Sequence, residues 1–388
     1  MTTTETTAPA WSGYGFEGTR WAVLGADTML AREPLMNPRD RWEYEDGLML
    51  NGVHAVHRLT GDPRYLAYVR RNIDHFVAED GTIRGYSREE YNLDHLNNGK
   101  AVLDLLAETG DPRYRLAADR LFAQVERQPR LRAGTFWHKQ IYPDQVWLDG
   151  LYMGSVFYAR YCVLTGRTDL LDDVVRQFTT AYDLTLEGPS GLCRHACDES
   201  RRMSWADPET GRSPHVWLRA LGWFVMAMTD VLEHLPAAHP GRERIATQLV
   251  DVLTALRAVR DPGTGLWFQI PDQAGRPLNY LESSGSFMVL AAVAKSLRCG
   301  YLAGDDWEQA LEQGWEHATR EFLSIDGRGW VNVHRMCHVA GLGGEPFRDG
   351  SYAYYMSEPV VTNDHKGVGP FLLLAAEMEH RRGLGDLG

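Results

Sequence analysis

The sequence predicts an all-α fold built as two concentric rings of helices, a six-fold double-ring α/α barrel or (α/α)6 toroid. Two observations lead to this prediction. The motif TGDPRY occurs at residues 60–65 and again at 109–114, and a looser copy, TGRTDL, begins at Thr165. Six further segments are apolar nearly all round, and each starts beside a glycine. A helix that is apolar on every side belongs inside a fold, whereas a one-sided helix covers it.

The one-sided helices follow the repeated motif. Apolar residues recur every three or four positions over residues 66–77 and 171–182, and again over 245–256 and 307–322. This spacing is typical of an amphipathic helix. The Asp-Pro step inside the motif indicates a turn in which the proline opens the next helix. These segments are therefore expected to form the outer ring.

The segments that are apolar all round are expected to form the inner ring. They begin near Gly47, Gly99, Gly150, Gly222, Gly285 and Gly367–Gly369. Glycine at these starts lets neighbouring helices approach closely at one rim. An open superhelix of helical hairpins is the alternative, but no polar capping repeat is visible at either end of the sequence. We expect a flexible N-terminal segment over residues 1–20 and one barrel domain over residues 21–388.

Composition excludes several classes of partner. The chain of 388 residues has a net charge of -12, which argues against nucleic acids and anionic membranes as partners. The five cysteines suggest no disulfide framework. Cys193, His195 and Cys197 would allow a zinc interpretation, but structural zinc usually needs a second ligand pair, and none follows. We expect no metal and no cofactor.

The sequence also bears on the location and the assembly state. The first ten residues, MTTTETTAPA, contain neither a basic stretch nor an apolar one, so no signal peptide is expected. No run is long and apolar enough to span a membrane. We therefore expect a cytoplasmic protein, either a monomer or a homodimer.

The six starts of the inner helices are expected to meet at one rim, together with the loops of residues 182–214 and 324–365. That rim would gather Asp46, Asp94, Asp149, His215 and Arg219 with several tryptophans. Tryptophan stacks on sugar rings, and arginine pairs with carboxylates, so the set predicts a pocket for an anionic sugar.

A structural role is the alternative for each of these residues. Asp94 and Asp149 stand at helix starts, where aspartate is a common cap. Arg219 would then pair with a neighbour, while His138 and His195 would be histidines satisfied within loops. Their recurrence beside tryptophan and glycine in different repeats favours the pocket.

Three stretches resemble the unsaturated uronyl hydrolases. They are FWHKQIYPDQVWLDGLYM (136–153), GLCRHACDESRRMSWADPETGRSPHVWLRALGW (191–223) and NDHKGVGPFLLLA (363–375). The resemblance is strongest to glycoside hydrolase family 105, the unsaturated rhamnogalacturonyl hydrolases, and weaker to the unsaturated glucuronyl hydrolases of family 88. It covers nearly the whole chain from about Trp42 onward, and it implies a six-fold double-ring helical barrel.

The resemblance implies a reaction and roles for individual residues. Such enzymes hydrate the double bond of a 4,5-unsaturated uronic acid at the non-reducing end of an oligosaccharide. Asp149 in the WLDG motif matches the general acid and base, and Asp94 a second essential aspartate. His195, Arg219 and Trp223 match residues that hold the uronate and its ring. The other binding residues predicted in the same pocket are His138, Trp147 and Trp42. The burial expected at the mouth of an apolar helix would favour the protonated form of the Asp149 carboxyl.

The implied substrate is a small acidic oligosaccharide, most simply unsaturated galacturonyl-rhamnose. Within the same mechanism, an unsaturated glucuronyl oligosaccharide is the alternative. An inverting glycosidase would instead use Asp94 and Asp149 on saturated glycosides. A sugar epimerase would need a pair of histidines on facing helices, and a non-catalytic repeat scaffold would need an open concave surface.

Overall fold

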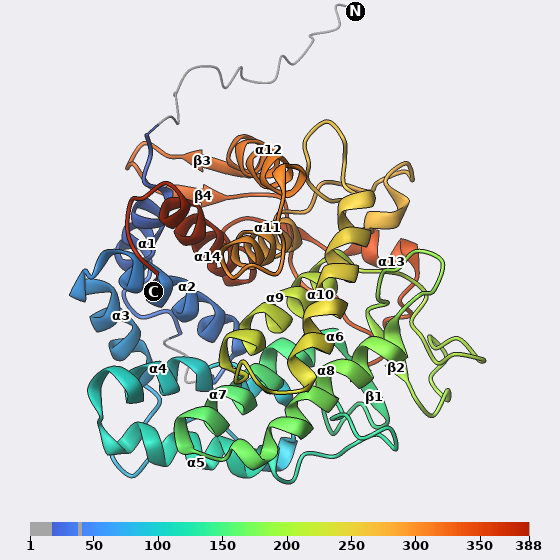
Figure 1. The fold of residues 1–388 in the computed structure, drawn as a ribbon, viewed down its shortest axis with the longest axis horizontal. Helices are drawn as coiled ribbons and strands as arrows, with labels where there is room; N and C mark the ends of the chain where they lie inside the picture. The colour runs from blue at the N-terminus through green and yellow to red at the C-terminus, as the bar shows by residue number, and fades with distance from the viewer. Residues whose placement is uncertain (1–17, 38–40, 388) are drawn as a thin grey trace, which may run out of the picture.

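A closed ring of helices forms the inside of the computed structural model, which describes residues 18–37 and 41–387 (Figure 1). In this described part each inner helix packs against the next, and the last returns to the first. The inner helices, in ring order, are α2 (Tyr44–Thr60), α4 (Gly99–Thr109), α7 (Val156–Thr165), α9 (Leu218–His234), α11 (Ser283–Arg298) and α14 (His365–Arg381).

A second ring surrounds the first, and each of its helices packs mainly on one inner partner. In the order of those partners, starting from α14, the outer helices are α1 (Trp21–Arg32), α3 (Pro63–Asp74), α5 (Pro112–Val125), α8 (Leu171–Thr185), α10 (Gly241–Ala258) and α12 (Asp305–Phe322). The predicted double-ring barrel is confirmed. The helix α1 was not predicted, because it precedes the first repeat. Residues 1–17 of the predicted flexible segment lie outside the described residues.

The repeated motif builds the turn from an inner helix to an outer one. Gly61 ends α2 with φ 69°, and the Asp62 side chain accepts a hydrogen bond from the backbone N–H of Arg64 at 2.9 Å. Gly110 and Asp111 do the same between α4 and α5. A left-handed glycine followed by an aspartate cap and a proline is a strong signal to stop one helix and start the next.

Glycine allows the close approach that was predicted for the inner ring. A Cβ atom on Gly285 would lie 2.5 Å from Leu218 Cγ, and one on Gly369 would lie 2.8 Å from the carbonyl oxygen of Leu48. Both distances are shorter than any non-bonded carbon contact. Neither position therefore accepts a larger residue without displacing the neighbouring helix.

The loops at the starts of the inner helices contain short strands that the sequence analysis did not predict. Each of the three pairs is antiparallel, and two or three residues are too few to show an alternating pattern. The pairs are β1 (Gln145–Trp147) with β2 (Ala196–Asp198), β3 (Leu323–Ile325) with β4 (Val331–Val333), and β5 (Met336–Cys337) with β6 (Val360–Val361).

Short helical segments complete these loops. They are η1 (Arg88–Glu90), η2 (Leu93–Leu96), α6 (Leu148–Gly150), the π-helix η3 (Leu151–Ser155), η4 (Thr168–Leu170), η5 (Pro271–Gln273) and α13 (Tyr352–Ser357). Across the described residues, no helix combines the length and the apolar character needed to cross a membrane.

A buried histidine joins the helices where the two ends of the chain meet. Figure 1 shows the red helix α14 beside the blue helices α1 and α2. His365, at the start of α14, places Nε2 2.9 Å from Glu33 Oε2 and Nδ1 3.3 Å from Asp46 Oδ1. Burial lowers the pKa of His365, but its bonds to Asp46 and Glu33 outweigh burial and raise the pKa to about 10. Protonated His365 therefore links the start of α14 to Glu33 after α1 and to Asp46 in α2, at the point where the inner ring closes.

Replacing His365 tests this closure. We expect His365→Asn to lower the free energy of unfolding by about 3 kcal/mol at pH 6, because it leaves two carboxylates without their cation. The histidine stabilises the fold only while protonated. The difference from the wild type is therefore full below pH 6.5 and shrinks as the pH rises toward 10. Urea unfolding at several pH values measures it. His317→Asn, at a partly exposed position on α12, is the control and should cost little.

Candidate active site

Two strands deliver Asp149 and His195 to the same place. Trp147 on β1 pairs with Ala196 on β2, and the N–H of Leu148 donates to the carbonyl of His195 at 3.1 Å. Asp149 follows in α6, so its Oδ2 lies 3.3 Å from His195 Nε2. Among the described residues neither of these two atoms has a hydrogen-bond partner of good geometry. Both are buried polar atoms whose hydrogen-bonding capacity is left unused by the described residues.

His195 is held from its other side by Tyr355 on α13. The distance from His195 Nδ1 to the Tyr355 hydroxyl is 2.8 Å, and the imidazole is fully buried. If the hydroxyl donates, Nε2 carries the imidazole proton and faces an ionised Asp149. If Nδ1 donates instead, Nε2 can accept a hydrogen bond from a protonated Asp149. A change of tautomer thus suits both states of an acid that later acts as a base.

Asp94 lies in a different electrostatic environment. Its carboxylate is 2.5 Å from Lys139 Nζ and 3.6 Å from His138 Nε2. Burial raises the pKa of Asp94, but the charge of Lys139 and its hydrogen bond are the main effects that outweigh burial and lower the pKa below its usual value. Asp94 is consequently a fixed anion, suited to accept hydrogen bonds rather than to donate a proton.

A stack of rings joins the two aspartates into one site. Trp147 lies between His138 and Tyr142, with ring centroids 4.8 and 4.9 Å away and nearly parallel planes. Its edge meets His195 at 5.2 Å. Burial lowers the pKa of His138 to about 4, so this ring is neutral at physiological pH. The structure therefore brings together Asp94, His138, Trp147 and Asp149 with His195.

Arg219 lies in the wall next to this group. It is buried, and it donates to the Ser284 hydroxyl and to the His338 carbonyl, both at 3.2 Å, as well as to the carbonyl of Cys337. Its guanidinium stacks over Trp217, at 4.8 Å from the ring. No described carboxylate forms an ion pair with Arg219. It is thus a buried cation without an anionic partner of its own.

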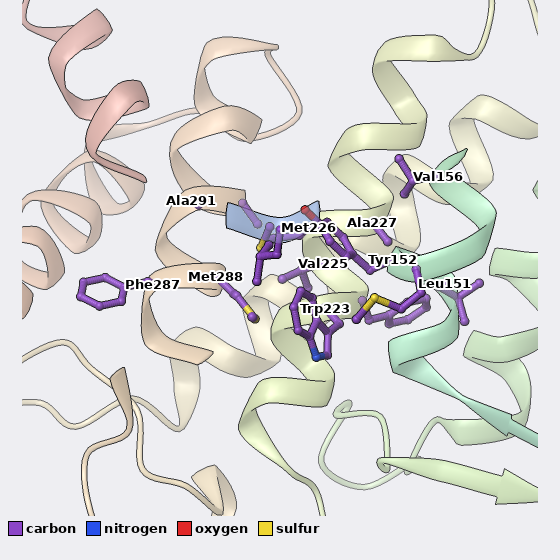
Figure 2. Close-up of a cluster of buried hydrophobic side chains, with 14 of the residues drawn as sticks. Leu151, Tyr152, Val156, Trp223, Val225, Met226, Ala227, Phe287, Met288 and Ala291 are labelled. Atoms are coloured by element: carbon purple, nitrogen blue, oxygen red, sulfur yellow. The ribbon is translucent and has the colours of Figure 1, made fainter. Parts of the chain in front are cut away.

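The two remaining predicted residues lie deeper in the structure. Trp223 is 1% exposed and packs against Tyr152 and Tyr44, in the apolar cluster that Figure 2 shows between η3, α9 and α11. Trp42 is 2% exposed, and its indole N–H donates to the His95 carbonyl at 2.7 Å. Both support the site from behind, and direct contact with a substrate stays a prediction for them.

Sequence reasoning did not single out four residues that the structure adds to the site. Lys139 stands beside the predicted His138, and Trp217 lies in a stretch that was predicted to reach the rim, so both had a local signal. Tyr44 is partly exposed and contacts Trp223. Tyr355 is 160 residues from His195, and only the fold brings the two together.

An open cleft of about 490 Å³ adjoins the site between the starts of α2 and α14. Lys366 Nζ lies in its wall, 2.9 Å from Asp364 and 3.3 Å from Glu45. Burial, and to a smaller extent the charges of Asp94 and Asp364, raise the pKa of Glu45 against the effect of Lys366. The start of α2, which lines this cleft, contacts the segment of Asp94, because the Asn97 side chain donates to the Tyr44 carbonyl at 2.7 Å. Its lining residues are Met36, Asn37, Glu43, Glu45, Asp46, His338, Asn363, Asp364, His365 and Lys366.

The fold and the site define a class of protein. A closed helical barrel that holds two carboxylates of different character, a buried arginine and stacked indoles at one rim is suited to act on sugars. Within the described residues, no group of three or more His, Cys, Asp or Glu side chains could hold a metal ion.

Comparison with known proteins gives the family. Residues 21–382 match the sequence profile of Glycosyl Hydrolase Family 88. A solved glycoside hydrolase of family 105 from C. acetobutylicum ATCC 824 superposes with a TM-score of 0.91 at 43% identity, covering 93% of this chain and 100% of that chain. The chain therefore belongs to the family that the profile of Glycosyl Hydrolase Family 88 describes. Its similarity to the solved family 105 enzyme identifies it as a member of the family 105 type.

Two curated proteins are also similar. Protein Atu3128 of Agrobacterium fabrum is 40% identical over 233 residues, which are 58% of this chain and 97% of that protein. The unsaturated rhamnogalacturonyl hydrolase YesR of Bacillus subtilis is 28% identical over 261 residues, which are 66% of this chain and 71% of that protein.

The role of Lys139 can be tested through pH dependence. In Lys139→Met the pKa of Asp94 rises, because the cation that lowers it is gone. Asp94 then loses its charge at a higher pH. We expect the acidic limb of the kcat/KM profile to move upward by about one pH unit. Arg202→Met removes an exposed cation that pairs with Asp144 at 2.8 Å, and should leave the profile in place. An unchanged limb in Lys139→Met would contradict the assignment.

The contact between Tyr355 and His195 provides a second test. Tyr355→Phe removes one buried hydrogen bond, so we expect kcat/KM to fall roughly fivefold, equivalent to about 1 kcal/mol. Tyr354→Phe is the matched control, since the Tyr354 hydroxyl accepts from the Gly341 N–H at 3.0 Å and does not bond His195. Equal activities of the two variants would remove Tyr355 from the site.

Proposed function

We propose that the protein hydrolyses small oligosaccharides that carry a 4,5-unsaturated uronic acid at the non-reducing end. The observation that carries this proposal is the pairing of Asp149 with His195 and Tyr355, facing a second aspartate that is fixed as an anion. One carboxyl that changes its protonation state, assisted by one that does not, suits the addition of water to an enol ether. The family and the name of the relative YesR support the same substrate class.

The proposed reaction begins with Asp149 in its protonated form. Asp149 donates its proton to C4, and the positive charge that develops at C5 is shared with the ring oxygen. A water molecule adds at C5 while the Asp149 carboxylate accepts its proton, which restores the acid. The resulting hemiketal opens to a ketone at C5 and leaves a hemiacetal at C1. This hemiacetal collapses to an aldehyde, which breaks the bond from C1 to the attached sugar and releases that sugar with the hemiacetal proton. The anomeric carbon is never attacked directly, unlike in ordinary glycosidases.

The other residues bind and orient the substrate in this proposal. Ionised Asp94 accepts hydrogen bonds from sugar hydroxyls or from the water. The cations Arg219 and Lys139 offer positive charge to the uronate carboxylate, and a charge-assisted hydrogen bond is roughly twice as strong as a neutral one. The indole N–H of Trp217 is buried and has no partner among the described residues, so it is a further donor for the sugar.

The leaving sugar is proposed to be neutral. The cleft beside the site carries Glu43, Glu45, Asp46 and Asp364 against Lys366 and His365. A second uronate or a sulfated sugar would meet like charge there, whereas hydroxyl groups donate well to carboxylates. Rhamnose fits this requirement, so unsaturated galacturonyl-rhamnose is the preferred substrate and an unsaturated glucuronide the alternative. The cytoplasmic location and the monomeric or homodimeric state stay predictions.

A direct assay tests the function. The purified protein, without added metal, is mixed with a lyase-generated unsaturated rhamnogalacturonan disaccharide, and the ultraviolet absorbance of the double bond is followed. We expect the absorbance to disappear while free rhamnose is released. Asp149→Asn should lower kcat by at least about 100-fold, because the proton donor is lost. Asp144→Asn removes a nearby carboxylate that pairs with Arg202 and should retain activity.

The possible results separate the candidate functions. Persistent absorbance with the rhamnogalacturonan product, but loss with an unsaturated glucuronide, would change the substrate and keep the chemistry. Release of sugar from saturated glycosides only would replace hydration by ordinary inverting hydrolysis. Full activity of Asp149→Asn would remove Asp149 from the acid and base role.

A further inference from the structure

Lys100 is a buried lysine that the proposed reaction does not use. It is the second residue of α4 and is 1% exposed. Its Nζ donates to the carbonyl oxygen of Tyr152 at 3.2 Å and lies 3.2 Å from the centroid of the Tyr152 ring. The chain's other three lysines, Lys139, Lys295 and Lys366, each pair with a carboxylate. No described carboxylate forms an ion pair with Lys100, so its binding partner is the backbone of Tyr152.

The backbone that Lys100 contacts has an unusual geometry. Tyr152 lies in the π-helix η3, which begins two residues after Asp149, and the N–H of Val156 donates to the carbonyl of Leu151 five residues earlier. Single π-helical turns are rare and often occur at functional sites, because they shift the side chains before and after them. A lysine that donates to a carbonyl inside this turn stabilises it against return to a regular α-helix.

Lys100 also belongs to the segment that carries the other aspartate. Asp94 lies in η2, and α4 begins at Gly99, so Lys100 follows Asp94 by six residues. The two segments pack closely. A Cβ atom on Gly150 or on Gly154 would lie 2.9 Å from a methyl carbon of Leu93. The bond from Lys100 to Tyr152 thus connects the segment of Asp94 to the segment of Asp149.

We propose that Lys100 is a positioning residue that fixes Asp94 and Asp149 relative to each other by holding the π-helical turn. The inference rests on the roles proposed for the two aspartates. The property of Lys100 that holds the turn is its ability to donate a hydrogen bond to the Tyr152 carbonyl, rather than its charge. Burial lowers the pKa of Lys100 well below its usual value, and the contact with the Tyr152 carbonyl needs only an N–H donor. A neutral donor of similar length should therefore replace it in part.

Three variants test the proposal. Lys100→Met keeps the length and the apolar stem but removes the donor, whereas Lys100→Gln keeps an N–H donor. Lys295→Met is the control, because Lys295 on α11 is partly exposed and forms its ion pairs with Asp230 at 2.6 Å and Glu233 at 2.7 Å. We expect Lys100→Met to lower kcat about tenfold while KM stays within twofold, and Lys100→Gln to recover at least half of the loss on a logarithmic scale. Lys295→Met should lower stability and leave kcat of the folded protein unchanged.

A second readout does not depend on the substrate. Hydrogen exchange of the backbone amides of residues 151–157 should become faster in Lys100→Met, but not in Lys100→Gln or Lys295→Met. Unchanged exchange, or a kcat of Lys100→Met within twofold of the wild type, would overturn the proposal. If Lys100→Met does not fold, the test relies on Lys100→Gln. Faster exchange of the amides of residues 151–157 in that variant would overturn the proposal. Absence of turnover by the wild type would instead contradict the proposed function and leave the exchange result to decide the role of Lys100 in the turn.

Discussion

Closure of the inner ring is the constraint on which the rest of the structure depends. Six helices that are apolar on all sides can bury those sides only if the last helix returns to the first. The return requires α14 to reach α2, and the cation of His365 between Glu33 and Asp46 joins the chain ends at that point. Closure brings all six helix starts to one rim. Residues as far apart as His195 and Tyr355 can then meet in one site.

The proposed reaction needs two carboxyl groups with different behaviour, and their neighbours supply the difference. Asp94 lies against a lysine, so ionisation is favoured despite burial. Asp149 lies against a fully buried histidine whose other nitrogen meets a tyrosine hydroxyl, so its partner can donate or accept a proton. Two chemically identical side chains thereby obtain separate roles, in the way that environment separates acids and bases in other enzymes.

Sequence reasoning was most successful where the signal is local. Helical periodicity and the Asp-Pro turns predicted the double ring, and the apolar starts with glycine located the rim. Asp94, Asp149, His138 and His195 were predicted and do lie together. Lys139 was passed over although it stands beside His138, and Tyr355 has no local signal, because its role depends on a contact 160 residues away. Trp42 and Trp223 look like stacking residues in the sequence, yet they are almost fully buried, since sequence does not tell which face of an indole meets the core.

The net charge of the whole chain and the local charges at the site have opposite effects on an anionic ligand. A chain with a net charge of -12 is an unexpected host for an anionic sugar, because its mean field repels the ligand. At the site the local charges reverse this. Among the described residues Arg219 is buried without an anionic partner, and the partly buried Lys139 pairs with Asp94. Desolvated cations act over short distances with little screening, whereas the exposed acidic surface is screened beyond about 8–10 Å in physiological salt. In the proposed function, binding of a uronate therefore depends on a few buried or partly buried groups, and the acidic cleft beside them is proposed to restrict what the uronate is attached to.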